Sequence, residues 1–85
     1  MNYVIEGNNI FLKENEKVVA SISFEQIDGD TYNINHTYVD ESLRGQGIAS
    51  ALVERAVKEI EKRDKNVTAT CSYAKKWLER NYYER

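Results

Sequence analysis

The chain has 85 residues, of which 41% are hydrophobic and 31% charged, and its formal net charge is −2. This size predicts one domain over residues 1–85, and the balance of charge argues against a nucleic-acid-binding module. The single cysteine excludes an internal disulfide, and the sequence shows no cluster of metal-ligating residues. It also shows no apolar run long enough to span a membrane and no signal-peptide pattern at its start. We therefore expect a cytoplasmic protein.

The first half of the chain predicts four antiparallel strands. Short β-rich segments at residues 3–6 and 10–12 flank the turn signal Gly7-Asn8-Asn9. Two longer strands, over residues 18–25 and 32–39, are joined by the turn Asp28-Gly29-Asp30. In each of these two strands apolar and polar side chains alternate with period two. The pattern predicts that one face of the first strand carries Val18, Ala20, Ile22 and Phe24, and that one face of the second carries Tyr32, Ile34, His36 and Tyr38.

The second half predicts a helix, a strand and a second helix. Apolar residues recur at helical spacing from about Gly47 to Arg63, namely Ile48, Ala49, Leu52, Val53, Ala56, Val57 and Ile60. The β-branched segment 67–70 predicts a fifth strand, which the right-handed crossover rule places parallel to the fourth. A second helix is expected over residues 72–81, with Ser72 as its cap and with Tyr73, Trp77 and Leu78 facing inward; the tail 82–85 is expected to fray.

The segment Arg44-Gly45-Gln46-Gly47-Ile48-Ala49, between the fourth strand and the first helix, has the pattern of an anion site. The first N–H groups of a helix lack internal partners, and the helix dipole adds partial positive charge there. Gly45 and Gly47 allow the backbone to approach a phosphate closely, and Arg44 offers a fixed positive charge. The pattern predicts a diphosphate ligand; a purely structural turn is the alternative.

The segment from Val39 to Leu52 resembles the acetyl-CoA motif of GNAT-type N-acetyltransferases, in which a strand ending in valine leads through Arg-Gly-x-Gly-Ile-Ala into a helix. His36-Thr37-x-Val39, Cys71 and Trp77-Leu78-x-Arg80 extend the resemblance to a minimal GNAT subfamily over nearly the whole chain. The resemblance implies an α+β fold of order β-β-β-β-α-β-α. Its mixed sheet would hold an antiparallel meander and a parallel fourth and fifth strand, with two helices.

The resemblance also implies acetyl-CoA as the cosubstrate. Its diphosphate would lie on the backbone of residues 45–49, around Gly45, Gln46, Gly47, Ile48 and Ala49, beside Arg44. Its pantetheine arm would meet the backbone of Tyr38 and Val39, where the fourth and fifth strands diverge. The chain departs from the family pattern where many members carry a tyrosine as general acid, because Leu78 stands at that position.

Acetyl transfer to an amine needs a base and a group that stabilises the departing thiolate. His36 is the only imidazole and suits a general base at neutral pH. Cys71, at the carboxyl end of the fifth strand, is a candidate proton donor or acetyl acceptor. We expect the acetyl group to pass directly from the thioester to the amine, and not through an acetylated Cys71. Glu25 and Glu41 remain alternative bases acting through water, and His36 and Cys71 as ordinary core residues remain the structural alternative.

Two functions follow from these expectations. The first is an N-acetyltransferase that acts on a primary amine of a small molecule, a peptide or a protein lysine. The second is an acyl-CoA-binding module with weak or no catalysis. Neither nucleic acid nor membrane is an expected partner, and we expect a monomer or weak dimer that pairs through its edge strands.

Overall fold

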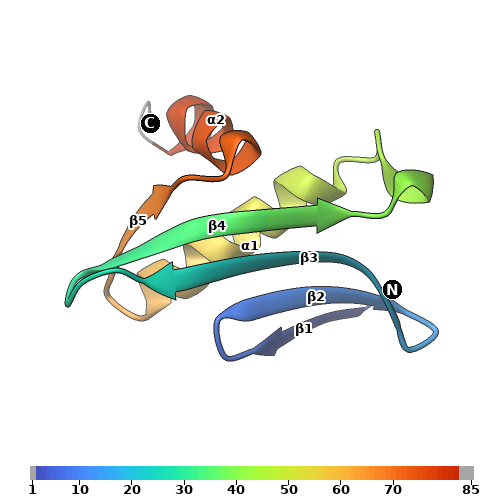
Figure 1. Cartoon of the computed structure of the whole chain (residues 1–85), viewed down its shortest axis with the longest axis horizontal. Coiled ribbons are helices and arrows are strands. Elements are labelled where there is room, and N and C mark those ends of the chain that lie inside the picture. Colours follow the sequence, from blue (N-terminus) through green and yellow to red (C-terminus); the bar gives the residue numbers. More distant parts are fainter. Residues whose placement is uncertain (1, 83–85) are drawn as a thin grey trace.

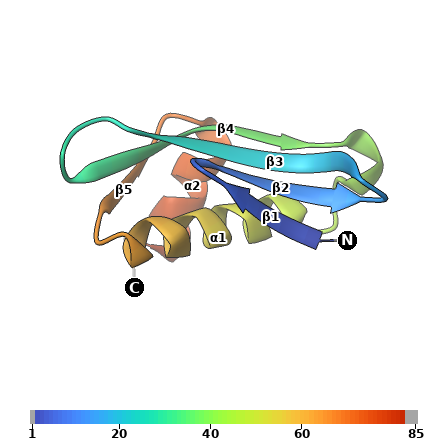
Figure 2. The same ribbon diagram turned by 90° about the horizontal axis from the view of Figure 1, so that it is seen from below.

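The computed structural model describes residues 2–82, in which a mixed five-stranded sheet packs against two α-helices (Figures 1 and 2). The sheet has the spatial order β1-β2-β3-β4-β5. The elements in chain order are β1 (Asn2–Glu6), β2 (Asn9–Glu14), β3 (Lys17–Gln26), β4 (Thr31–Val39), the short 3₁₀ turn η1 (Glu41–Leu43), α1 (Ile48–Lys62), β5 (Asn66–Ala69) and α2 (Ser72–Asn81).

The pairing of the strands confirms the predicted fold class. β1 to β4 form an antiparallel meander, whereas β4 and β5 are parallel, with Thr31 opposite Asn66 and Ile34 opposite Ala69. The connection through α1 crosses one face of the sheet, and α2 lies beside α1 near the β5 edge (Figure 2). The opposite face, which we call the outer face, carries no helix of the described residues (Figure 1).

The hydrophobic core lies between the sheet and the two helices. The stripe predicted for α1 is confirmed for its six buried residues Ile48, Leu52, Val53, Ala56, Val57 and Ile60. Side chains of the strands cover this stripe, chiefly Ile10, Leu12, Ala20, Ile22, Phe24 and Ile34. At about 25 cal/mol per Å² of apolar surface removed from water, this layer is the main source of stability.

Two β-bulges change which side chains share a face. Val19 is an extra residue of β3 opposite β2, and Val18 is consequently 37% exposed instead of buried. Asn35 is an extra residue of β4 opposite β3, between the pairs that Ile34 and His36 make. The prediction that Ile34 and His36 share a face is therefore wrong, because each bulge shifts the period-two pattern by one residue.

Arg63 ties the C-terminus of α1 to the β1–β2 hairpin. Its guanidinium donates to Oδ1 of Asn8 at 2.7 Å, to the carbonyl oxygen of Gly7 at 2.8 Å and to Oε2 of Glu59 at 2.9 Å. Glu59 and Arg63 thus form an ion pair one helical turn apart, as do Glu54 and Lys58. The fork of guanidinium donors lets one side chain satisfy three acceptors at this corner of the fold.

The second helix begins one residue away from the predicted cap. Cys71 is the N-cap and Ser72 the first helical residue, so the prediction of Ser72 as cap is wrong. Leu78 is buried as predicted and Trp77 is half-buried, whereas Tyr73 is 43% exposed instead of facing inward. The tail predicted to fray spans residues 82–85: Tyr82 caps α2 with a hydrogen bond from its N–H to the carbonyl of Leu78, and residues 83–85 lie outside the described residues. Neither α1 nor α2 is long and apolar enough to cross a membrane.

Candidate functional site

The turn before α1 leaves the start of the helix open. Gly45 and Gly47 have φ angles of +84° and +76°, a left-handed conformation that side chains disfavour, and a Cβ atom at either would meet nothing within 4 Å. The N-cap Gly47 has no side chain to cap the helix, and the first intrahelical bond runs from Ala51 N to Gly47 O at 3.1 Å. The N–H groups of Ile48, Ala49 and Ser50 are consequently without helix acceptors and suit an anion.

A cavity of about 350 Å³ lies over this turn. All of the predicted coenzyme-binding residues except Tyr38 and Gln46 line this cavity. Its lining is Val39, Leu43, Arg44, Gly45, Gly47, Ile48, Ala49 and Tyr73. The structure therefore gathers the end of β4, the glycine turn, the first turn of α1 and one side chain of α2 around a single space. Unpaired N–H groups and a guanidinium can bind a phosphate, and the side chains of Val39, Leu43 and Tyr73 can contact a less polar part of the same ligand.

Tyr73 is the site residue that the sequence analysis missed. Its spacing from Trp77 and Leu78 suggested a core position, but it lines the cavity together with the glycine turn. The sequence carries no local signal for this position, because the rotation of α2 decides whether residue 73 faces the core or the cavity. With its apolar ring and hydroxyl, Tyr73 suits an amphipathic ligand.

The far edge of β4 offers free backbone groups beyond Ile34. The carbonyl of Ile34 accepts from the N–H groups of both Thr70 and Cys71, at 3.1 and 3.3 Å, and the parallel pairing of β5 ends there. Asp40 N donates to Val19 O, so antiparallel alternation directs the backbone of Tyr38 toward β3. The N–H and C=O groups of Thr37 and Val39 point instead away from β3, toward the edge of β4 beyond its last pair with β5, and we call the space along this edge the gap. Val39, and not Tyr38, thus has its backbone at the predicted place.

Cys71 lies at this gap, where its Sγ is 3.4 Å from Oγ1 of Thr37. Partial burial raises the pKa of the thiol, but the Thr37 hydroxyl and the backbone at Ala74 and Tyr73 favour the thiolate. The balance holds the pKa of Cys71 below its ordinary value. A partly exposed thiol with a lowered pKa is suited to exchange a proton with a group that enters the gap.

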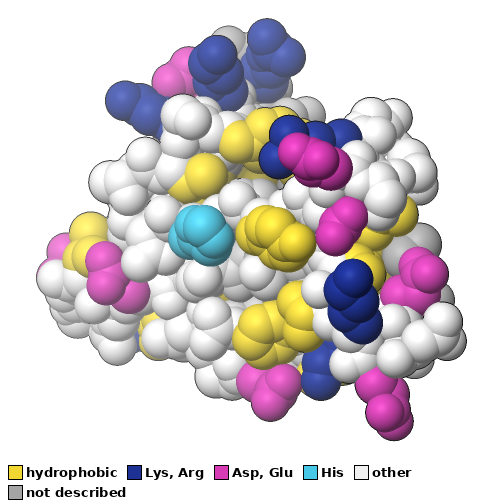
Figure 3. Space-filling view, turned by 45° about the vertical axis from the view of Figure 1, so that its right-hand side comes forward, with side chains coloured by type: hydrophobic (Ala, Val, Ile, Leu, Met, Phe, Trp, Pro, Cys, Tyr) yellow, Lys and Arg dark blue, Asp and Glu magenta, His cyan; other side chains and the backbone are white. Residues whose placement is uncertain are grey.

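His36 lies on the outer face of the sheet. It precedes Thr37 in β4, and successive side chains of a strand point to opposite faces, so β4 separates the imidazole from the thiol of Cys71. Figure 3 shows the histidine at the surface beside an apolar patch. Tyr38, which shares its face, is 42% exposed. The two predicted catalytic residues thus lie on opposite sides of one strand, and no hydrogen bond of the described residues joins them.

The loop that leads to the glycine turn is held by Asp40. Its carboxylate accepts from the backbone N–H of Ser42 at 3.0 Å and from the Ser42 hydroxyl at 2.8 Å. These two bonds hold the pKa of Asp40 below its ordinary value. The alternative bases Glu25 and Glu41 are exposed. Within residues 2–82 no group of three or more His, Cys, Asp or Glu side chains is placed to hold a metal ion.

Comparisons with known proteins match a family model over most of the chain. Residues 9–85 match the model of a family described as GCN5-related N-acetyl-transferase. Protein NATD1 of Xenopus tropicalis is 31% identical over 62 residues, which are 73% of this chain and 57% of that relative. The chain therefore spans little more than half the length of the curated relative.

Solved structures share the fold. The solution structure of a GCN5-like protein from Staphylococcus aureus matches with a TM-score of 0.75 and 28% identity, over 93% of this chain and 78% of that one. A predicted acetyltransferase from Clostridium acetobutylicum, solved with acetyl-CoA, matches with a TM-score of 0.67. Its identity is 18%, over 91% of this chain and 57% of that one, and it supports the fold alone.

Proposed function

The chain belongs to the GCN5-related N-acetyl-transferase family, and from this we propose that it transfers an acetyl group from acetyl-CoA to a primary amine. The observation that carries the proposal is the open N-terminus of α1, where left-handed Gly45 and Gly47 leave unpaired N–H groups facing a cavity. The structural relative from Clostridium acetobutylicum was solved with acetyl-CoA, and the proposal extends that cosubstrate to the present chain.

The residues around the cavity fit the parts of acetyl-CoA. The N–H groups at the start of α1 would hold the diphosphate, with the guanidinium of Arg44 beside it. Thr37 and Val39 offer backbone donors and acceptors to the amides of the pantetheine arm. Tyr73 would cover the arm from α2. When bound, acetyl-CoA supplies an activated acyl thioester, and the protein supplies position and proton transfer.

Cys71 and His36 would handle protons on opposite sides of β4. The thiol of Cys71 lies in the gap beside Thr37 and would donate a proton to a departing thiolate. His36, on the outer face, would accept a proton from the incoming amine directly or through one water. Direct transfer within a ternary complex is preferred over acetylation of Cys71, because the amine and the thioester would approach the gap from two different faces.

The acceptor would come from the outer face. No helix of the described residues covers this face, so a side chain on a larger molecule can reach it (Figure 1). We therefore propose an exposed lysine of a protein or peptide as the acceptor class, ahead of a small amine that would need an enclosing pocket. The cytoplasmic location stays a prediction from the sequence.

A second candidate is an acyl-CoA-binding module with little catalysis. Leu78 favours this second function. Its side chain is 1% exposed, and it stands at the position where many family members carry a tyrosine that acts as the general acid. Among residues 2–82, only Cys71 offers a thiol in place of that phenol.

Thiol release from acetyl-CoA tests the proposed function. The purified protein is incubated with acetyl-CoA and a panel of lysine peptides and small amines, and free CoA thiol and acetylated amine are measured together. Turnover that falls at least tenfold in Cys71→Ala or His36→Ala supports the proposal. Turnover that both variants retain in full would contradict the catalytic assignment. Binding of acetyl-CoA with no turnover for any amine favours the binding module.

A further inference from the structure

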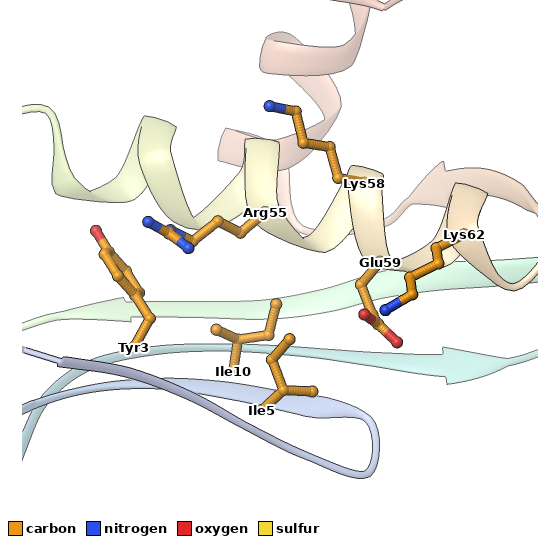
Figure 4. A pocket seen from close by; sticks show the side chains of 7 residues that line it. All are labelled: Tyr3, Ile5, Ile10, Arg55, Lys58, Glu59 and Lys62. Atoms are coloured by element: carbon orange, nitrogen blue, oxygen red, sulfur yellow. The ribbon is translucent and has the colours of Figure 1, made fainter.

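A groove separate from the coenzyme site lies between the β1–β2 hairpin and α1 (Figure 4). Its volume is about 250 Å³, and it shares no residue with the cavity over the glycine turn. It is lined by Tyr3, Ile5, Ile10, Arg55, Lys58, Glu59 and Lys62. The function proposed above does not use this groove.

The floor of the groove is apolar and open. Ile5 is 52% exposed, the side chain of Ile10 is fully buried below it, and the ring of Tyr3 closes one end. The guanidinium of Arg55 lies 3.7 Å from the centre of that ring, a cation–π contact that holds Arg55 along the groove. An exposed large aliphatic residue beside a fixed cation favours a ligand with both apolar and anionic groups.

Two positively charged side chains stand at the ends of the groove. Figure 4 shows Arg55 reaching toward Tyr3 at one end and Lys62 beside the carboxylate of Glu59 at the other, with the isoleucines between them. No ion pair among the described residues engages Arg55 or Lys62. The other charged lining residues are already paired: Lys58 with Glu54 at 3.1 Å and Glu59 with Arg63 at 2.9 Å.

The backbone beside the groove has a free strand edge. β1 pairs only with β2 among the described strands. Phe24 N donates to Asn8 O, and alternation across β2 then makes Val4 and Phe11 a hydrogen-bonded pair. The N–H and C=O groups of Tyr3 and Ile5 consequently point away from the sheet. The residues whose side chains line the groove therefore also present unpaired backbone donors and acceptors.

We propose that this groove and edge bind an extended acidic peptide of a partner protein as a sixth strand. The peptide would pair with the backbone of Tyr3 and Ile5 and place an acid–apolar–acid pattern, at alternate positions, toward α1. The first and last of three such positions are about 13 Å apart. Arg55 and Lys62 are seven residues apart on one helix, or about 10 Å along its axis, a span that long side chains match.

Charge favours this occupant over a second copy of the chain. Pairing of two β1 edges would bring Arg55 and Lys62 of both copies to one seam, where like charges repel. The chain as a whole has a net charge of −2, so the cationic groove is a local reversal of sign and not a general property of the surface. An acidic strand would neutralise both ends of the groove and cover Ile5.

The probe is a blocked heptapeptide, Thr-Glu-Thr-Val-Thr-Glu-Thr, titrated into the ¹⁵N-labelled full chain. We expect saturable shifts of the amides of Tyr3 and Ile5. A peptide with both glutamates replaced by glutamine should bind several-fold more weakly. Two further peptides carry one N-methyl group, either on the valine or on the threonine after it. Strand addition predicts that one of the two binds and the other does not, since only alternate amides face β1.

Matched protein variants test the charge. Lys62→Gln should weaken the acidic peptide about two- to fivefold, whereas Lys75→Gln, an exposed change on α2, should leave its affinity unchanged. Equal affinities for the two N-methylated peptides, equal effects of the two variants, or no shift at millimolar peptide would each overturn the proposal. So would concentration-dependent shifts of the same amides without peptide, which indicate self-pairing. Acetyl-CoA binding and turnover are separate measurements, so either proposal can fail alone.

Discussion

The indole Nε1 of Trp77 donates to Oγ of Ser50 at 2.8 Å. This bond joins α2 to the first turn of α1, whose unpaired N–H groups form the anion site. Tyr73 lies one helical turn before Trp77, so the same bond sets where Tyr73 faces the cavity. The position of α2 relative to the coenzyme site thus depends on a contact between two side chains that do not themselves line the cavity over the glycine turn.

We expect Trp77→Phe to lower the free energy of unfolding by about 1 kcal/mol, because it keeps most of the ring and removes the donor. It should also weaken acetyl-CoA binding about two- to threefold by loosening α2. Urea unfolding and calorimetric titration measure the two effects. The double variant with Ser50→Ala should be no worse than Trp77→Phe alone; additive effects would show that the bond does not form in solution.

Gly47→Ala should cost about 1–2 kcal/mol of stability and reduce acetyl-CoA binding at least tenfold. The cost arises from the φ angle of +76°, since a Cβ atom there meets nothing within 4 Å. Gly29→Ala is the matched control, because Gly29 also has open space and does not have a left-handed φ. If the two alanine variants unfold at the same urea concentration, the left-handed conformation of Gly47 is wrong.

Arg63→Met should lower the free energy of unfolding by about 1–3 kcal/mol, since it leaves acceptors of Asn8, Gly7 and Glu59 without their donor. Lys58→Met is the control: its pair with Glu54 is exposed and contributes about 0.3–0.5 kcal/mol. Chemical denaturation of both variants gives the comparison. Equal losses would mean that Arg63 does not tie α1 to the hairpin.

The thiol of Cys71 should ionise at lower pH than a free cysteine, whose pKa is about 8.5. The rate of alkylation by iodoacetamide, followed by mass spectrometry against pH, measures its midpoint. Thr37→Val should raise this midpoint, because the hydroxyl favours the thiolate. Thr31→Val, on the same strand, should not.

The lowered pKa of Cys71 also determines how the stability of the fold changes with pH. A thiol whose pKa is lower in the folded state adds stability above its unfolded pKa and loses that contribution as the pH falls through the folded pKa. Wild-type protein should therefore gain stability between neutral pH and pH 9 relative to Thr37→Val. An unchanged difference across this range would argue against the Thr37–Cys71 contact.

The sequence predicted the elements of the fold because each carries a local pattern. The helical period of α1, the turn residues at Gly7 and Gly29 and the parallel crossover to β5 all depend on short-range rules. The bulges at Val19 and Asn35 carried no such signal, since an extra residue is invisible in a period-two pattern until the partner strand is known. They moved His36 to the outer face and Val18 to the surface.

The candidate site was predictable where backbone conformation dictates residue type. Left-handed Gly45 and Gly47 with Arg44 form a motif that the structure places around one cavity. Tyr73 was not predictable, because its exposure depends on the rotation of α2, which the Trp77–Ser50 bond helps to set. The roles of Cys71 and His36 stay predictions.

A titration of the ¹⁵N-labelled protein with acetyl-CoA tests the central claim most directly. The account predicts saturable shifts at Gly45, Gly47, Ile48 and Ala49, and their loss in Arg44→Ala at the same ligand concentration. It also predicts that the amides of the groove by β1 remain unchanged. If the amides at the start of α1 do not respond to millimolar acetyl-CoA, the helix terminus does not bind the coenzyme and the account is contradicted.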